Sequence, residues 1–283
     1  MKILFCGDIV GRAGRDVLVG NLPRVKRALA LDLVIANGEN AAHGFGITDT
    51  IGRQLFEAGV DVITTGNHAW DRRESLSYYA SEPRLLRPHN YPKGCPGRGY
   101  GVFKAANGQS VLVANLMGRL FMDALDDPFA QLEELLDRHR LGSAVAASVI
   151  DVHAEATSEK MALAHLADGR ASLVVGTHSH VPTADAQRLP GGTAYQTDAG
   201  MCGDYDSVIG MQKQASLQRF RTKLPGEKLA PAEGPATLCG VFVETDARSG
   251  LARSVAPLRL GGRLAPAWPD AAGARPVWAA AAE

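Results

Sequence analysis

The chain has 283 residues, 46% of them hydrophobic and 21% charged, which is the composition of a globular protein long enough to bury a large core. Lysine plus arginine and aspartate plus glutamate both number 30, which excludes a bulk electrostatic attraction to nucleic acid or to an anionic membrane. The four cysteines form no Cys-x-x-Cys pair, and the apolar runs match neither a signal peptide nor a membrane span, so we expect a cytoplasmic protein.

Short apolar runs alternate with helical patterns in the N-terminal third of the chain. Strands are predicted at 2–6, 31–36 and 60–65, and helices at 15–30, 48–59 and about 71–80. The first helix is expected to break near Gly20 and Pro23. Thr48 and Gly59 are the expected N-cap and C-cap of the second helix. This alternation predicts a parallel sheet.

The rest of the chain mixes hairpins with further parallel units. Hairpins are predicted at 99–116, 183–198 and 236–260, strands at 144–152 and around 173–176, and helices at 127–140, 157–167 and 207–222. The combination predicts an α/β fold in which two mixed sheets pack face to face between outer helices, a four-layer α/β/β/α arrangement. We expect a single domain over residues 1–283, with about 261–283 as a peripheral tail.

Polar side chains follow five of the predicted parallel strands, at the point where each strand ends. In open α/β sheets, ligands bind outside the carboxyl ends of the strands, so these side chains are expected to meet. One such residue would be unremarkable, but five at the same topological position are hard to explain as solvated loops. The residues are Asp8, then Glu39 with Asn40, then Asn67 with His68, then His153, and finally His178 with His180.

These residues form a mixed nitrogen and oxygen ligand set without a thiolate. Such a set suits Fe, Mn, Co or Zn rather than calcium or a structural zinc. The set exceeds what one ion needs, so two ions sharing a bridging carboxylate are indicated. Taken singly, Asp8 and Asn67 could be loop caps, Glu39 and His153 a buried ion pair, and His68 a core histidine.

The order of these motifs resembles the calcineurin-like metallophosphoesterases, whose pattern is GDxHG, GDxxD, GNHD/E, a single His and GHxH. Val10 stands where a histidine ligand is usual, "NGEN" replaces the second motif, and "GNHAWD" has no acid directly after the histidine. These departures resemble the YmdB-like family of bacterial metallophosphoesterases, from residue 1 to about 260. Residues 197–211 also resemble that family, except that Cys202-Gly203-Asp204, expected at the rim of the site, replaces Thr-Gly-Pro.

The resemblance implies an assignment for each ligand. It gives one metal to Asp8, Glu39, Asn40 and His180, and the other to Glu39, Asn67, His153 and His178, with Glu39 as the bridge. Iron is the favoured metal, with Mn, Co or Zn as alternatives. His68 is left as the proton donor. His43 is expected to be solvated, and a reactive role for Cys202 is not favoured because nothing nearby in the sequence would lower its pKa.

The resemblance further implies a homo-oligomeric phosphodiesterase, in which a hydroxide bridging the two metals attacks phosphorus while His68 protonates the leaving alkoxide. The favoured substrates are 2′,3′-cyclic nucleotides, followed by 3′,5′-cAMP and aryl phosphodiesters, and no substrate-binding residue is assigned. One alternative is a metallohydrolase acting on amides or lactams, but the chain lacks the H-x-H-x-D-H spacing. Another is a regulatory or RNA-interacting protein that retains its metals for control; zero net charge and 6% aromatic content argue against an extended RNA surface.

Overall fold

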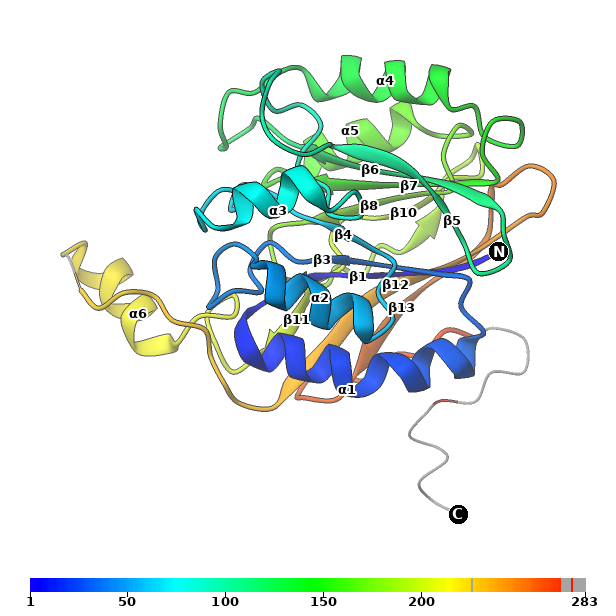
Figure 1. The fold of residues 1–283 in the computed structure, drawn as a ribbon. Helices are drawn as coiled ribbons and strands as arrows, with labels where there is room; N and C mark the ends of the chain where they lie inside the picture. Colours follow the sequence, from blue (N-terminus) through cyan, green and yellow to red (C-terminus); the bar gives the residue numbers. More distant parts are fainter. Residues whose placement is uncertain (225, 271–275, 277–283) are drawn as a thin grey trace.

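Two mixed β-sheets pack face to face, with helices on both outer faces (Figure 1). The computed structural model describes residues 1–224, 226–270 and 276. Helices α1 and α2 cover one sheet, and α4 and α5 cover the other. The predicted α/β fold with two mixed sheets is therefore confirmed.

The first sheet has the order β2-β11-β12-β1-β3-β4, with β13 also paired to β12. In its centre, β1 is antiparallel to β12 and parallel to β3, so segments from both ends of the chain lie side by side. The strands are β1 (Lys2–Cys6), β2 (Asp8–Ile9), β3 (Leu33–Asn37), β4 (Val62–Thr64), β11 (Met201–Asp204), β12 (Ala236–Thr245) and β13 (Ala252–Leu260).

The second sheet has the order β5-β6-β7-β8-β10-β9. Its central strands β6, β7, β8 and β10 are parallel, and an antiparallel strand closes each edge. The strands are β5 (Tyr100–Lys104), β6 (Ser110–Met117), β7 (Ala147–His153), β8 (Leu173–Thr177), β9 (Gln187–Arg188) and β10 (Ala194–Gln196). All three predicted hairpins are present.

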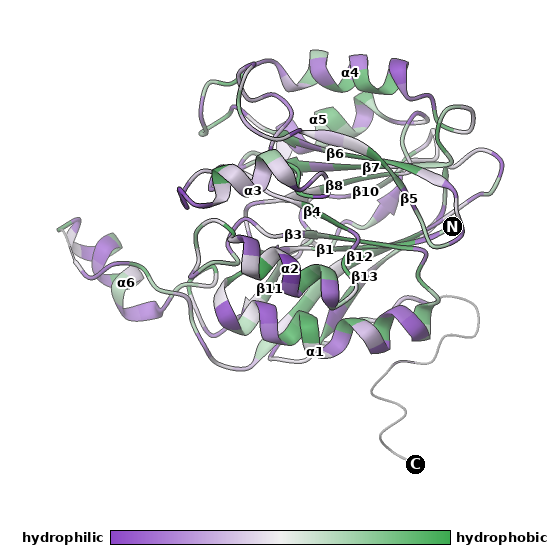
Figure 2. Cartoon of the chain, viewed as in Figure 1, coloured by the Kyte–Doolittle hydropathy of each residue, from purple (hydrophilic) through white to green (hydrophobic). Residues whose placement is uncertain are grey.

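Buried apolar side chains form three layers, which explains why the central strands are apolar on both faces. One layer joins α1 and α2 to the first sheet, a second fills the space between the sheets, and a third lies under α4 and α5. Figure 2 shows hydrophobic colour along the central strands and mixed colours on the outer helices. The helices are α1 (Gly11–Leu29), α2 (Asp49–Glu57), α3 (Ser75–Ser81), α4 (Pro128–Arg138), α5 (Thr157–Leu166) and α6 (Lys213–Thr222).

Helix α1 corrects the first predicted helix. It begins at Gly11, four residues before the predicted start, and continues through Gly20 and Pro23, so the predicted break is wrong. A proline inside a helix costs about 3 kcal/mol. Four apolar side chains on one face are fully buried, and each contributes about 1.5–3 kcal/mol, which outweighs that cost. They are Leu18, Leu22, Val25 and Leu29.

Two other helices start later than predicted, one because of side-chain contacts and one because of a backbone turn. Helix α3 starts four residues later than predicted, because Asp71 binds His68 and Arg72 donates to backbone carbonyls of the 42–45 loop. Helix α6 starts at Lys213 rather than 207, because residues 207–211 form a turn closed by paired hydrogen bonds between Val208 and Met211.

The caps of α2 agree with the sequence at one end only. The Thr48 hydroxyl accepts a hydrogen bond from the Ile51 amide at 3.3 Å, as predicted for an N-cap. The C-cap is Ala58, and Gly59 follows it with a φ of 107°, a left-handed conformation that favours glycine.

The C-terminal segment is described only in part. Trp268 packs, partly buried, against the apolar layer that contains α1, and residues 271–275 and 277–283 of the predicted tail lie outside the described residues. The single-domain boundary at 1–283 stays a prediction. Within the described ranges, no helix combines the length and the apolar character needed to cross a membrane.

Candidate metal centre

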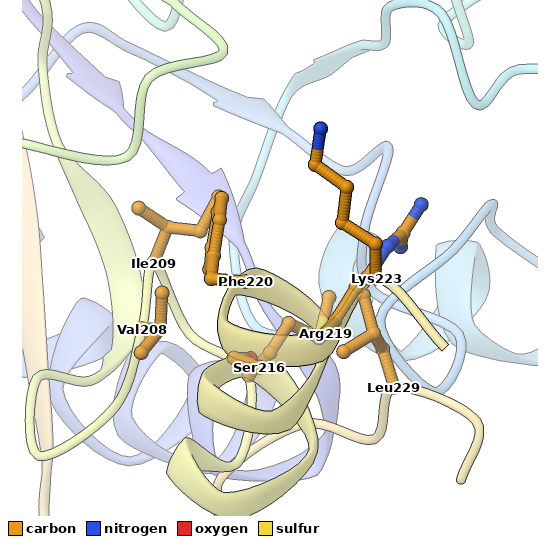
Figure 3. Close-up of a pocket in the computed structure, with 8 residues that line it drawn as sticks. Val208, Ile209, Ser216, Arg219, Phe220, Lys223 and Leu229 are labelled. Atoms are coloured by element: carbon orange, nitrogen blue, oxygen red, sulfur yellow. The ribbon is translucent and has the colours of Figure 1, made fainter. Parts of the chain in front are cut away.

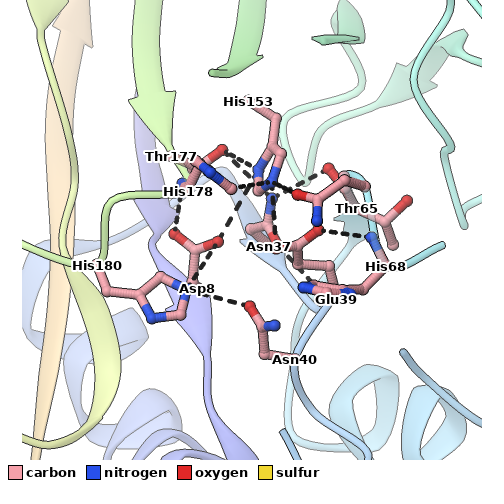
Figure 4. Close-up of polar contacts among 12 residues, drawn as sticks. Asp8, Asn37, Glu39, Asn40, Thr65, His68, His153, Thr177, His178 and His180 are labelled. Carbon is pink, nitrogen blue, oxygen red and sulfur yellow. Dashed lines mark hydrogen bonds and ion pairs between the residues drawn. The ribbon is translucent and has the colours of Figure 1, made fainter. Parts of the chain in front are cut away.

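The carboxyl ends of strands from both sheets lie close together, and the predicted site residues lie there, all of them labelled in Figure 4 except Asn67, which contacts His153. The first sheet supplies Asp8, the first residue of β2, and the loops after β3 and β4 supply Glu39, Asn40, Asn67 and His68. The second sheet supplies His153, the last residue of β7, and the loop after β8 supplies His178 and His180.

The first possible metal-binding group consists of Glu39, His153 and His178, whose ligand atoms all lie within 4.8 Å of one another. The Nε2 atom of His153 lies 3.1 Å from Glu39 Oε1 and 3.1 Å from His178 Nδ1. The same atom lies 2.9 Å from Asn67 Oδ1. Together with Asn67, the three residues of this group are the four that the resemblance gives to one metal.

The second possible group consists of Asp8, Glu39 and His180, within the same 4.8 Å limit. The Nε2 atom of His180 lies 3.8 Å from Asp8 Oδ1 and 3.2 Å from Asn40 Oδ1. Glu39 belongs to both groups, which is the position expected for a bridging carboxylate. Their roles as metal ligands stay predictions.

Each histidine of these groups is oriented through its other ring nitrogen. His180 Nδ1 donates to the Ile209 carbonyl at 2.8 Å, which leaves the lone pair of Nε2 for the site. His153 Nδ1 lies 2.8 Å from the Thr177 hydroxyl, which donates to Asp151 at 2.7 Å. His178 Nε2 lies 3.2 Å from Glu155, so its Nδ1 faces the site.

The backbone around the two neighbouring histidines is strained. His178 and His180 have φ values of 93° and 64°, and such strain persists only where the surrounding structure enforces it. Between them, Ser179 donates its amide and its hydroxyl to one oxygen of Asp198, at 3.1 and 2.8 Å. Lys160 donates to the same oxygen at 2.8 Å, so a buried ion pair holds this loop.

The geometry of the site fits a cation. Asp8 Oδ1 is buried and has no hydrogen-bond partner within the described ranges, which is costly for a carboxylate oxygen unless a positive charge faces it. A Cβ atom at Gly66 would lie 2.2 Å from the His153 ring and 2.3 Å from Glu39 Oε2, so only glycine leaves room for both side chains.

The electrostatics show what balances the carboxylates without a metal. Burial alone would raise the pKa of Glu39, but the charge and hydrogen bond of His153 outweigh it and hold this pKa at about 2. Burial opposes the charge on His153, yet Glu39 raises its pKa to about 9. Burial and the charge of His153 lower the pKa of His178 to about 3. The Glu39–His153 ion pair, which was the alternative considered from the sequence, is therefore present. A bound cation would take the place of the proton on His153 that balances Glu39.

His68 lies beside the two groups and is not a member of either. Its backbone amide donates to Glu39 Oε2 at 3.3 Å, and its Nδ1 lies 2.8 Å from Asp71 Oδ2. Its side chain remains 26% exposed and lines a cavity of about 270 Å³ together with Glu39 and His178. His68 therefore reaches the cavity without belonging to either possible metal-binding group, and its role as proton donor stays a prediction. His43, by contrast, is exposed, as expected.

The comparison with protein families identifies the family of this chain. The model of the YmdB-like protein family matches residues 4–258. The chain belongs to the YmdB-like family. The resemblance seen in the sequence is therefore confirmed.

Relatives of this YmdB-like chain carry phosphoesterase names. The chain is 48% identical to the 2′,3′-cyclic-nucleotide 2′-phosphodiesterase of Bacillus subtilis, over 87% of this chain and 92% of that protein. A crystal structure described as a novel phosphatase from Mycoplasma pneumoniae has a TM-score of 0.85 and 34% identity, covering 92% of this chain and 93% of that one. A hypothetical protein from Thermus thermophilus has a TM-score of 0.86 and 45% identity, covering 93% and 100%.

The Cys202-Gly203-Asp204 segment, expected at the rim of the site, is not a rim loop. Cys202 to Asp204 lie in the buried strand β11, which pairs with β2 and β12, so the rim expectation is wrong. Helix α1 packs so closely on β11 that a Cβ at Gly14 would lie 2.1 Å from the Cys202 carbonyl. Burial also raises the pKa of Cys202 well above its ordinary value, which leaves the thiol unreactive, as expected.

Four residues that orient the site are absent from the sequence-based set. Asp71 and Glu155 contact His68 and His178, and each lies two or three residues after a predicted site residue, which is a usable signal. Asp151 and Asp198 are fully buried carboxylates, and the sequence places them near strand ends without showing their partners. Asp198 stands in the "TDAG" segment that carried part of the resemblance.

Proposed function

We propose that this chain is a binuclear-metal phosphodiesterase that hydrolyses 2′,3′-cyclic nucleotides, and also 3′,5′-cAMP and aryl phosphodiesters. The observation that carries the proposal is the pair of possible metal-binding groups that share Glu39 at the junction of the two sheets. The name of the Bacillus subtilis relative, to which 87% of this chain aligns, supports the choice of substrate.

The residues divide into two ligand sets. Asp8, Asn40 and His180 would hold one divalent ion with Glu39, and the residues of the other group, with Asn67, would hold the second. When bound, the two ions would lower the pKa of a water molecule and neutralise the charge of the phosphate. Because the ligand set contains only two carboxylates, a binuclear site keeps a net positive charge for a phosphate in a chain of zero net charge.

His68 is the proposed proton donor. Asp71 fixes its Nδ1, so Nε2 is free to give a proton to the alkoxide that leaves the phosphorus. Its ring lines the cavity without belonging to either ligand group, so the same side chain is not needed to hold a cation.

We also propose iron as the native metal and the cytoplasm as the location. The imidazole and oxygen donors suit iron or manganese, with cobalt and zinc as alternatives. All four cysteines are free, which is compatible with a reducing compartment. The homo-oligomeric state stays a prediction.

The test is metal analysis together with turnover. Protein purified with metal supplementation should contain about two transition-metal ions per chain and hydrolyse 2′,3′-cAMP and bis-p-nitrophenyl phosphate. Glu39→Gln should lose both properties, whereas Glu57→Gln, an exposed glutamate at the end of α2, should keep them. One ion or none in the supplemented protein contradicts the binuclear site. Two ions without turnover contradict the enzyme and favour the regulatory alternative.

A further inference from the structure

A second cavity adjoins the candidate metal centre. It has a volume of about 490 Å³ and lies between the 208–211 turn and helix α6 (Figure 3). Ile209, Met211 and Leu229 line this cavity and also the 270 Å³ cavity at the metal centre. The carbonyl of Ile209 accepts the hydrogen bond of His180, so the wall between the two cavities is tied directly to a predicted metal ligand.

The lining of this cavity combines apolar and cationic side chains. Phe220 lies beside Ile209 in Figure 3, Arg219 lies on the same helix as Phe220, and Lys223 directly follows that helix. Lys223 caps the C-terminal end of α6 in a left-handed conformation, and its amide donates to the Arg219 carbonyl, so the two residues lie together at that end of the helix. Within the described ranges, neither side chain has a hydrogen-bond or ion-pair partner, and the Lys213–Lys223 segment has four basic residues and no acidic one.

The composition matches a ligand that carries both an aromatic ring and a negative charge. The 77% exposed ring of Phe220 offers a stacking face, and the volume lies within the usual range for a small organic ligand. Two cations that line one cavity at the C-terminal end of α6 suit a phosphate. A nucleoside 2′,3′-cyclic phosphate whose cyclic phosphate lies at the metals has no second phosphate to bind Arg219 and Lys223. The same compound with a 5′-phosphate has one.

We propose that this cavity is the nucleoside subsite, in which the base stacks on Phe220 and a second phosphate binds Arg219 and Lys223. The inference rests on the proposed phosphodiesterase function and makes it more specific. The preferred substrates are then 2′,3′-cyclic phosphates that also carry a 5′-phosphate, rather than 2′,3′-cyclic mononucleosides without one.

The experiment compares three substrates with the metal-loaded full chain. These are adenosine 2′,3′-cyclic phosphate with a 5′-phosphate, the same compound without it, and glycerol 1,2-cyclic phosphate, which has neither base nor second phosphate. The wild type should prefer the 5′-phosphorylated nucleotide by roughly tenfold in kcat/KM. Arg219→Ala combined with Lys223→Ala should abolish that preference and leave glycerol 1,2-cyclic phosphate unchanged.

Two further variants complete the design. Phe220→Ala should raise KM for both nucleotides by roughly tenfold and leave the glycerol compound unchanged. Arg221→Ala is the matched control, because Arg221 lies on the same helix, carries the same charge and lines neither cavity. It should behave as the wild type. Equal effects of Arg221→Ala and of the Arg219 and Lys223 changes would overturn the subsite.

Equilibrium binding of both nucleotides, measured in parallel, separates this inference from the proposed function. A 5′-phosphate preference in binding without turnover contradicts the phosphodiesterase and supports the subsite. Turnover of all three substrates without any preference overturns the subsite and leaves the phosphodiesterase standing. Phe220→Ala could instead change the elution volume in size-exclusion chromatography and leave the nucleotide affinities unchanged. That result also overturns the subsite, and it identifies α6 as a contact between copies of the chain.

Discussion

His68 and Asp71 form a pair in which one residue faces the cavity and the other fixes its orientation. The 2.8 Å contact to Asp71 engages Nδ1, so only Nε2 is available toward a bound phosphodiester. Phe45 contacts the His68 ring edge-on at 5.0 Å and limits its rotation. A side chain held in this way can deliver a proton to one defined position, which is the requirement for a general acid.

Replacing His68 should affect substrates according to their leaving groups. General acid catalysis typically contributes about 10²–10⁴-fold. A ribose alkoxide is strongly basic and needs a proton, whereas p-nitrophenolate leaves without one. His68→Ala should therefore slow hydrolysis of 2′,3′-cAMP by roughly 10²-fold or more and slow bis-p-nitrophenyl phosphate much less. The rates are measured on protein whose metal content matches the wild type.

Asp71→Asn is the companion variant for this test. It keeps the size of the side chain and removes its negative charge, so it should give a smaller loss than His68→Ala with the same dependence on the leaving group. Equal losses for both substrates in His68→Ala, with the metals still bound, would exclude a proton-donor role and leave His68 as a positioning residue.

Glu39 and Asn40 are neighbours with unequal roles. Glu39 belongs to both possible metal groups and supplies a charge, whereas Asn40 lies only beside His180 and supplies a neutral oxygen. Glu39→Gln should therefore lower metal content and activity by a larger factor than Asn40→Ala. Elemental analysis and 2′,3′-cAMP turnover measure the two effects. Similar small losses in both variants would rule out the bridging position.

The sequence predicted the site residues that lie at strand ends. It missed the residues that hold those site residues in position. Asp8, Glu39 and His153 were accessible to prediction because strand ends of parallel units converge by topology. The contact between Asp198 and Ser179, and that between Glu155 and His178, depend on how loops from different strands fold over one another. Local sequence patterns contain no information about such contacts.

At the scale of elements, the loop after β8 depends on helix α5 and on the segment before β11. Lys160 on α5 and Asp198 form an ion pair in which both side chains are at most 1% exposed. Removing one partner of such a pair leaves a buried charge without compensation, which typically costs about 3–5 kcal/mol. Asp198 of this pair also accepts two hydrogen bonds from Ser179. Loss of the pair should therefore allow His178 and His180, which flank Ser179, to move.

Asp198→Ala should therefore lower both the free energy of unfolding and the metal content. Urea denaturation should show a loss of about 3–5 kcal/mol. The control is Asp137→Ala, which breaks the exposed ion pair with Arg170 and should cost less than about 1 kcal/mol. A second variant, Asp198→Ala with Lys160→Met, removes both charges and should recover stability without recovering metal binding. Recovery of both would show that Asp198 does not position the histidine loop.

Element boundaries were predictable where a cap or an apolar period marks them. Thr48 identified the start of α2, because its hydroxyl caps the helix locally. Pro23 misled the prediction for α1, because the burial of one helix face depends on the sheet beneath it. The two-residue strand β2 and the strand β11 have no periodic pattern of their own and depend on pairing, β2 with β11 and β11 with both β2 and β12.

At the scale of the whole molecule, the candidate metal centre joins the two sheets. Asp8, Glu39 and Asn40 come from the first sheet, and His153, His178 and His180 come from the second. The sequence predicted two packed sheets because parallel units and hairpins alternate along the chain. The predicted ligands divide between the two sheets because the sheets pack against each other. Binding of each ion should therefore stabilise the contact between the sheets.

Metal removal should consequently lower the melting temperature of the whole chain. A ligand that binds only the folded state at 100 times its dissociation constant adds about 2.7 kcal/mol, which corresponds to a rise of roughly 5 °C or more for a chain of this size. Scanning calorimetry of the chelator-treated protein, before and after the addition of manganese, measures the rise. Glu39→Ala should abolish it, because this residue belongs to both possible metal groups, whereas Glu57→Ala, at an exposed position on α2, should preserve it. An equal rise in the Glu39→Ala protein would place the stabilising ions elsewhere and would contradict a metal centre at the junction of the sheets.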